Sequence, residues 1–168
     1  VLTRFNVVGA VHGSHTLPSL GWHQHRFELF DRICYPSMRS QTNQGFKWLV
    51  FFDANTPQVY RQKIEEYAAW KNFVPCYVES MANQRDQFIR ANLEPSARSL
   101  ITTRLDTDDA FSKEFIANTQ SQFRGQPFEF INFPSGYILD IINDKLYTTE
   151  QRSNAFISLI EAVDGFRT

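Results

Sequence analysis

The apolar run FKWLVFF at residues 46–52 constrains the fold more than any other segment of this chain. It is almost continuously hydrophobic, and a single carboxylate, Asp53, ends it. Strands of a parallel sheet carry helices on both faces, so they have uninterrupted apolar sequences of this kind. The run therefore predicts a strand that is buried on both faces, and with it an α/β fold.

Strand-like and helix-like segments alternate from residue 2 to residue 123. Further strands are expected at residues 2–8, 73–79 and 100–105. The helical spacing of apolar residues predicts helices at residues 22–39, 57–70, 84–93 and 113–123. Pro36 is expected to kink or end the first helix, while Thr56 and Ser112 are expected to cap the second and the last. This order predicts a parallel sheet with right-handed crossovers.

The pattern changes after residue 123. Residues 128–133 are expected to form a strand, and residues 137–142 and 145–149 flank Asn143-Asp144, a dipeptide suited to a tight hairpin turn. A short helix is expected at residues 154–162. We therefore expect a single domain with a Rossmann-like, mostly parallel sheet flanked by helices, and a smaller antiparallel β addition near the C-terminus.

Composition limits the partners of this domain. Its 168 residues are enough for one ordinary core, and 42% of them are hydrophobic, which is typical of globular proteins. The net charge of −1 provides no basic face, which argues against a nucleic-acid partner. Two cysteines cannot supply a disulfide framework, and no apolar run approaches the ~18 residues of a membrane span. A cytoplasmic protein is expected, with peripheral association at the inner face of the membrane left open.

Polar side chains follow three of the expected strands. Thr3 and Arg4 belong to the first, Asp53 follows the second, and the sequence DTDD at residues 106–109, here called the aspartate loop, follows the fourth. Carboxyl ends of parallel strands meet at one edge of a sheet, where α/β proteins bind ligands. Asp53 alone is equally consistent with a turn residue.

Three carboxylates within four residues repel one another unless a positive charge lies among them. The sequence predicts Mg²⁺ or Mn²⁺ held by Asp106, Asp108 and Asp109, because hard oxygen ligands favour these ions. A cap for the next helix is the plainer alternative. Arg104 precedes Asp106 by two residues and points to the same side of the strand, so it is expected to pair with Asp106 or with a phosphate.

The remaining candidates are weaker. Four histidines fall in one early segment, where surface positions or contacts to an acceptor are favoured over a zinc site: His12, His15, His23 and His25. Cys34 and Cys76 lie in apolar patterns and are expected in the core. Arg85 is expected to form a salt bridge or to contact a phosphate.

Two segments together resemble family-two glycosyltransferases. The sequence CYPSMRSQTNQGFKWLVFFDANT, residues 34–56, resembles their opening signature, and LITTRLDTDDAF, residues 100–111, resembles their metal-binding Asp-x-Asp motif. LTRFNV, RFELFDRICYPSMRSQT and NAFISLIE resemble a bacterial group described as rhamnosyltransferases. Asp53 departs from the usual pattern, because Ala-Asn-Thr follows it.

The resemblance implies a GT-A fold and a nucleotide-diphospho-sugar donor, with an inverting transfer to a glycan or lipid-linked acceptor. Residues 1–110 would form the donor half and residues 111–168 part of the acceptor half. By match to the motifs, the nucleotide sugar would lie along Thr3, Arg4, Phe5, Asp53, Arg85, Arg104 and Asp106. Asp108 would bind the metal, with Asp106 and Asp109 beside it. Glu161 is the expected catalytic base, ahead of Asp140 and Asp144, with a base outside this sequence as the alternative.

Two other functions stay open at this point. One is a non-catalytic or truncated domain that binds a nucleotide sugar within a larger glycan synthase. The other is a Mg²⁺-dependent phosphatase of the haloacid dehalogenase type, which also uses Asp-x-Asp after a strand. That family places the motif at its first strand, whereas here it follows the fourth expected strand and precedes Ala110 and Phe111.

Overall fold

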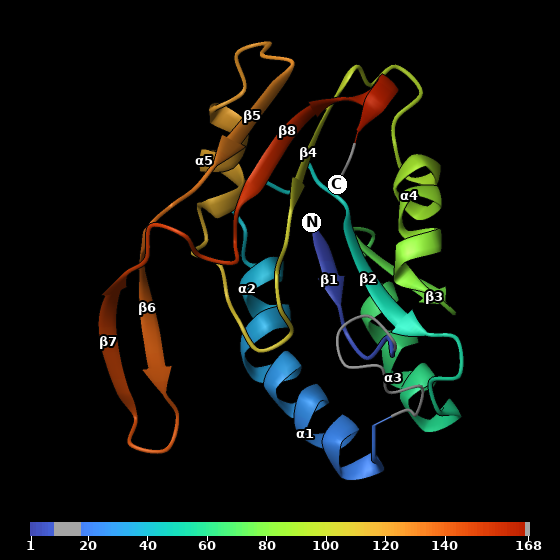
Figure 1. The fold of residues 1–168 in the computed structure, drawn as a ribbon. Helices are drawn as coiled ribbons and strands as arrows, with labels where there is room; N and C mark the ends of the chain where they lie inside the picture. Colours follow the sequence, from blue (N-terminus) through green and yellow to red (C-terminus); the bar gives the residue numbers. More distant parts are fainter. Residues whose placement is uncertain (9–17, 167–168) are drawn as a thin grey trace.

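A parallel three-stranded sheet forms the centre of the protein. The computed structural model describes residues 1–8 and 18–166. Its sheet runs in the order β1 (Leu2–Arg4), β2 (Trp48–Asp53) and β3 (Phe73–Val78), with both pairs of strands parallel. Figure 1 shows the three strands side by side. The expected parallel α/β core is thus confirmed for these strands, although β1 ends earlier than residue 8.

The central strand β2 is buried on both faces, as the run FKWLVFF predicts. All six of its residues are buried. Trp48, Val50 and Phe52 join one hydrophobic cluster, while Leu49 and Phe51 join another. The alternation follows from the two-residue period of a strand. Two separate hydrophobic layers therefore fix β2 from opposite sides.

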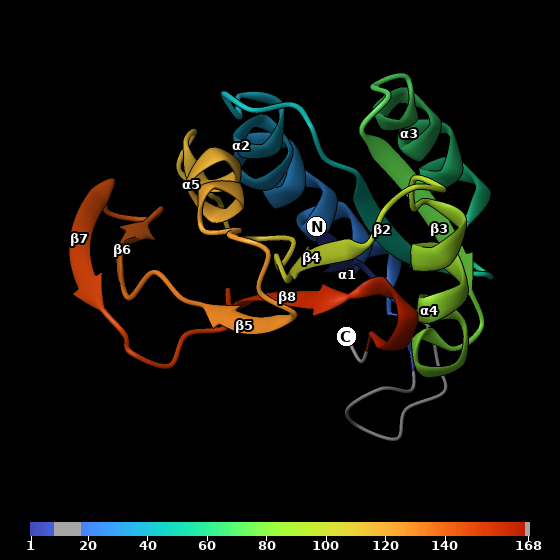
Figure 2. The same ribbon diagram turned by 90° about the horizontal axis from the view of Figure 1, so that it is seen from above.

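Helices supply both layers. On one face lie α1 (Leu20–Leu29), the π-helical segment η1 (Phe30–Cys34), α2 (Tyr35–Arg39) and α3 (Gln58–Ala68). On the other lies α4 (Met81–Ala91). Figure 2 shows the first group on one side of the sheet and α4 on the other. The helices α3 and α4 have 11 residues each, and in the described ranges no helix is long and apolar enough to cross a membrane.

The helix from residue 20 to residue 39 is continuous, and its middle turn is widened. The Tyr35 N–H donates to the carbonyl of Phe30, five residues earlier, and Pro36 follows directly. Proline has no N–H and crowds the carbonyl four residues before it, so a wider π turn relieves the mismatch. Pro36 therefore distorts the helix without ending it.

A second sheet is antiparallel and contains β4 (Ser99–Thr103), β8 (Ser158–Ala162) and β5 (Phe128–Ile131) in that order. The helix expected at residues 154–162 is wrong. Its second half is β8, which lies between two strands, and the Ser158 and Thr103 hydroxyls are 2.6 Å apart across the pair. Pairing with distant strands overrides the local pattern.

The two sheets meet at the end of β4. Leu2 and Arg104 form a parallel bridge, and the Leu105 N–H donates to the Leu2 carbonyl at 3.0 Å. At this point β4 runs in the same direction as β1 and β2. The ends of β1, β2 and β4 therefore share one edge, as expected for the polar segments that follow them.

The C-terminal part adds α5 (Phe115–Ser121), a hairpin of β6 (Ser135–Asp140) and β7 (Lys145–Glu150), and the short 3-10 helix η2 (Val163–Gly165). The expected hairpin is present, but Asp140 pairs with Lys145, which leaves a turn of residues 141–144. The Asp140 carboxylate accepts hydrogen bonds from the backbone of Ile142 and Asn143. Figures 1 and 2 show the hairpin set apart from β1, β2 and β3.

Each of the three helices after α2 begins at a residue other than the expected one. The helix α3 begins at Gln58, and the Thr56 hydroxyl donates to the Asp53 carbonyl instead of capping the helix. The helix α5 begins at Phe115, and its cap residue makes no side-chain bond, so Ser112 is not the cap. The helix α4 begins at Met81, three residues before the expected Gln84. In each case the local turn before the helix, which propensity does not describe, sets the first residue.

Candidate functional site

A buried polar cluster lies at the C-terminal ends of β1 and β2. The Asp53 N–H donates to the Asn6 side-chain oxygen at 3.0 Å, and the Asn6 amide nitrogen donates to the Thr56 hydroxyl at 3.1 Å. All three residues are buried. Because Asn6 follows β1 and Asp53 closes β2, the cluster fixes the relative position of the two strand ends. Sequence analysis did not identify Asn6.

His23 extends this cluster into α1. Its Nε2 lies 2.9 Å from the Asn6 amide nitrogen, and its Nδ1 lies 2.9 Å from the Ser19 carbonyl. These partners assign the proton to Nδ1, so Nε2 accepts from Asn6. His23 is fully buried, which corrects the expectation of a surface or acceptor-contacting histidine. His25 is exposed, and His12 and His15 lie outside the described residues.

Asp53 makes the local contact expected of a turn residue. Its carboxylate accepts from the Asn55 N–H at 2.8 Å and closes the turn after β2. The residue is 3% exposed. A turn role for Asp53 is therefore visible in the structure, and its position at the shared edge is compatible with a further contact to a ligand.

The aspartate loop continues from β4 at the same edge. The Asp109 N–H donates to the Asp106 carbonyl at 3.3 Å, and Thr107 between them is buried. The π-helical segment packs against this loop, because the Cys34 thiol donates to the Asp106 carbonyl at 3.5 Å. The loop thus lies between β4 and the helix at residues 20–39.

Guanidinium groups lie among the carboxylates. Arg104 binds both oxygens of Asp106, at 3.1 Å from Nε and 2.8 Å from Nη2. Arg26 of α1 lies 2.7 Å from the Asp108 carboxylate and donates to the Thr107 hydroxyl at 3.2 Å. The expected pairing of Arg104 with Asp106 is confirmed. The sequence does not indicate Arg26, because no local pattern predicts its contact with Asp108, which is 82 positions away.

Burial and like charge act on Asp109. Its pKa is raised, first by burial and then by the negative charges of Asp108 and Asp106. The same three carboxylates add to the effect of burial on Cys34, whose pKa is well above its ordinary value. Burial also raises the pKa of Cys76 to about 12. Both thiols are buried and protonated at neutral pH, which confirms that they belong to the core.

The end of α2 holds the segment that follows the aspartate loop. The Gln41 side chain donates to the Ser112 carbonyl at 2.8 Å and accepts from the Ile116 N–H at 3.0 Å. The Ser37 hydroxyl accepts from the Phe111 N–H at 3.4 Å. The sequence SMRSQT therefore has a structural role, since it ties the helix to residues 111–116.

Thr3 of β1 and Arg85 of α4 have their partners outside the aspartate loop. Thr3 and Phe5 are buried, and the Thr3 hydroxyl accepts from the Trp48 indole N–H at 2.8 Å. Arg4 is exposed. Arg85 forms an ion pair with the neighbouring Asp86 at 3.1 Å. The structure thus brings together Arg104 and the three aspartates, but it places the side chains of Thr3 and Phe5 in the core.

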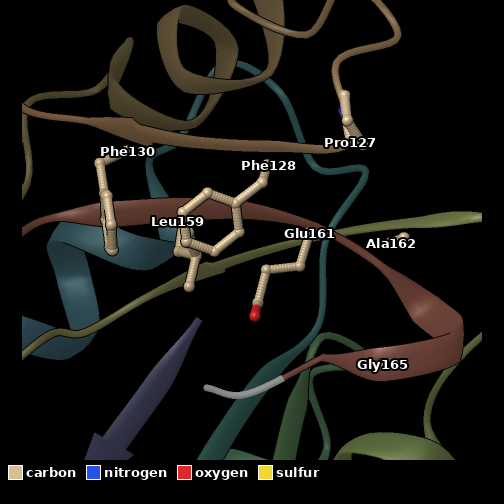
Figure 3. Close-up of a pocket in the computed structure, with 7 residues that line it drawn as sticks. All are labelled: Pro127, Phe128, Phe130, Leu159, Glu161, Ala162 and Gly165. Carbon is tan, nitrogen blue, oxygen red and sulfur yellow. The ribbon is translucent and has the colours of Figure 1, made fainter.

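Glu161 lies in a different part of the molecule. It pairs with Leu100, at the start of β4, and lines an open apolar pocket of about 430 Å³. The other lining residues are Pro127, Phe128, Phe130, Leu159, Ala162 and Gly165. Figure 3 shows the Glu161 side chain pointing into the space beside the Phe128 ring. Asp106 lies six positions after Leu100, roughly 20 Å along an extended strand, so Glu161 and the aspartate loop are not brought together.

Asp140 and Asp144 belong to the hairpin turn. Hydrogen bonds from the side chain and backbone of Asn143 lower the pKa of Asp140. Asp144 adopts a positive φ of 50°, which Asp tolerates in turns. Both residues serve the turn, as the sequence indicates for Asp144.

A model of the family described as "Putative rhamnosyl transferase" matches residues 13–167. No curated protein matches the chain.

Proposed function

Because the chain belongs to this rhamnosyl transferase family, we propose that it is a metal-dependent glycosyltransferase. In this proposal it moves a sugar, such as rhamnose, from a nucleotide-diphosphate donor to a glycan or lipid-linked acceptor. The family name supports transfer of a sugar at a coarse level. A transferase also needs a donor and an acceptor, and the shared edge of the sheet supports a nucleotide donor that is held together with a metal.

The observation that carries the proposal is the shared edge of β1, β2 and β4. Asn6 and Asp53 lie at the ends of two neighbouring parallel strands, and the aspartate loop follows the third. In open α/β sheets this edge is where nucleotides bind. A donor placed there would have its base near Asp53 and its diphosphate near Asp108.

The carboxylates fit a divalent ion that is shared with a substrate. Within residues 1–8 and 18–166, no three His, Cys, Asp or Glu side chains are arranged to hold a metal by themselves. Mg²⁺ and similar ions in nucleotide-dependent enzymes are commonly bound by one or two carboxylates, with phosphates and waters completing the shell. Asp108 suits this role because its side chain is 44% exposed. Asp109 would be the second ligand or would support the first.

The residues of this edge would act mainly by positioning. When bound, a divalent ion would neutralise the charge that builds on the diphosphate as the sugar leaves. Asp108 would hold that ion, while Arg104 keeps the Asp106 carboxylate in place through two hydrogen bonds. An inverting transfer also requires a base within hydrogen-bond reach of the acceptor hydroxyl. Glu161 pairs with Leu100 at the start of β4, so in this proposal it would not reach a sugar held at Asp108.

Calorimetry with UDP and dTDP tests the proposal. We expect the folded protein to bind one of these diphosphates, and to bind it at least tenfold more tightly with Mn²⁺ than with a chelator present. Asp108→Asn should abolish that metal effect, because it removes the charged ligand. Asp144→Asn is the matched control, since Asn also tolerates the positive φ of the hairpin turn. Absence of metal-dependent binding in a folded sample would overturn the proposal.

Turnover separates a transferase from a domain that only binds the donor. We expect slow hydrolysis of a dTDP- or UDP-sugar in the presence of Mn²⁺, measured as release of the nucleoside diphosphate. Asp108→Asn should suppress it and Asp144→Asn should not. Tight donor binding without any release, with or without candidate glycan acceptors, would instead support a non-catalytic sugar-nucleotide module.

A further inference from the structure

Arg26 of α1 contacts the aspartate loop, although it is far from the loop in the sequence. Its guanidinium lies 2.7 Å from the Asp108 carboxylate, 3.2 Å from the Thr107 hydroxyl and 5.3 Å from the centre of the Trp22 ring. Trp22 stands four residues earlier on α1, so the two side chains share a helix face. Three different contacts therefore hold this cation at the carboxylate that best suits a metal.

The ion pairs nearly balance the charge of the loop. Arg104 neutralises Asp106 and Arg26 neutralises Asp108, which leaves one uncompensated carboxylate, Asp109. A divalent ion that binds Asp108 must compete with the guanidinium of Arg26 for the same oxygens. The pair is open to competition, because the two side chains are 28% and 44% exposed and exposed pairs are weak.

We propose that Arg26 exchanges partners when the donor binds, an inference that rests on the proposed function. Without a donor, Arg26 holds Asp108. When a nucleoside diphosphate arrives with its divalent ion, Asp108 turns to the ion and the guanidinium of Arg26 turns to the diphosphate. Arg26 and Asp108 each keep an opposite charge as a partner throughout the exchange, and no covalent bond changes.

The chemistry of arginine suits the second half of this exchange. The planar guanidinium presents several donors in a fork that matches two phosphate oxygens at once. The Trp22 ring limits how far the side chain can swing, so Arg26 stays beside the loop after it leaves Asp108. The helix itself does not depend on Arg26, because the buried neighbours His23 and Phe27 fix α1 to the core. Arg26 is thus a positioning and donor-binding residue.

Titrations of Arg26→Ala with two probes test the exchange. For Mn²⁺ alone, followed by the loss of the free-ion resonance, we expect binding about two- to fivefold tighter than in the wild type, because the competing cation is gone. For UDP or dTDP in saturating Mn²⁺, followed by calorimetry, we expect binding about tenfold weaker, because a charge-assisted hydrogen bond to phosphate is lost. The opposite signs distinguish an exchange from a general loss of structure.

Two further variants complete the experiment. Arg26→Lys keeps the charge but not the fork, so Mn²⁺ alone should bind as in the wild type while the nucleotide binds a few-fold more weakly. Arg32→Ala removes an exposed arginine from η1 of the same helix and should change neither titration. The Lys variant also answers the question if Arg26→Ala fails to fold.

The outcomes separate the two proposals. If the wild type binds no nucleoside diphosphate with Mn²⁺, the proposed function fails and the exchange fails with it. If the wild type binds and Arg26→Ala matches it in both titrations, only the exchange is overturned. Weaker binding of both probes would also overturn it, because it would show that Arg26 merely holds the aspartate loop in shape.

Discussion

The strand β2 and the hairpin of β6 and β7 are both rich in apolar side chains, yet their surroundings are opposite. Every residue of β2 is buried between two layers of helices. On the hairpin, Tyr137 is 69% exposed, Leu146 is 62% exposed and Ile142 is 94% exposed. Hydrophobic sequence alone therefore does not determine burial in this protein. The helices that cover the parallel sheet do, and the candidate site is built on the covered part.

The largest effect is expected in that covered part. Phe52→Ala should lower the free energy of unfolding by about 3–5 kcal/mol, because it leaves a cavity in a dense core. Phe52 is fully buried, with its ring 5.0 Å from that of Phe5 and 5.9 Å from that of Tyr77. Urea unfolding followed by circular dichroism measures the change.

Phe128→Ala is the control of the same residue type. Phe128 is 57% exposed and lines the pocket beside β5 and β8, so we expect a loss below about 1 kcal/mol. Equal losses at Phe52 and Phe128 would erase the distinction between covered and uncovered parts of the molecule.

An intermediate effect is expected from alkali. Cys34 and Cys76 are protonated in the folded protein, since burial raises the pKa of both thiols, to about 12 for Cys76. In the unfolded chain they ionise near pH 8.5. Stability from these groups is therefore complete below about pH 8.5 and falls above it, by about 1.4 kcal/mol per thiol for each pH unit.

Urea unfolding at pH 7.5, 8.5 and 9.5 measures that decline. Cys76→Ala should lessen its slope, because only one buried thiol remains. Native labelling by a thiol reagent offers an independent reading: at pH 8 both cysteines should react only as fast as the protein unfolds. Rapid labelling of the folded protein would show that solvent reaches Cys34 or Cys76 without unfolding.

The smallest effect is expected at the tip of the hairpin. Ile142→Ser should change the free energy of unfolding by no more than about 0.5 kcal/mol, because the side chain is already in water. The same urea experiment measures it. A loss above 2 kcal/mol would mean that the hairpin is covered in solution and that the contrast with β2 is weaker than it appears from one chain.

The local sequence was sufficient to predict those segments whose structure depends on their own pattern of residues. The uninterrupted run of β2 predicted a strand buried on both faces, and the apolar runs around Asn143-Asp144 predicted a hairpin. The order of strands and helices predicted that polar strand ends meet at one edge. Each of these features depends on periodicity and chain direction, which the sequence shows directly.

Features that depend on distant partners were not predictable in the same way. The strand β8 was expected to be helical, because its own residues do not show that β4 and β5 lie on either side of it. The pair of Arg26 and Asp108 joins residues 82 positions apart. The buried role of His23 depends on Asn6, which belongs to another element. In all three cases the deciding contact comes from a residue that is distant in the sequence.

The widened turn at η1 has a consequence for how this chain tolerates changes in length. The helix at residues 20–39 touches the region after β4 at both ends, through Arg26 on one side of the π turn and through Ser37 on the other. One residue more or less within residues 30–34 would rotate one half of the helix against the other by about 100°. Insertions and deletions there would therefore change the angle between two contacts with the region after β4, and they would also displace Cys34 from the Asp106 carbonyl.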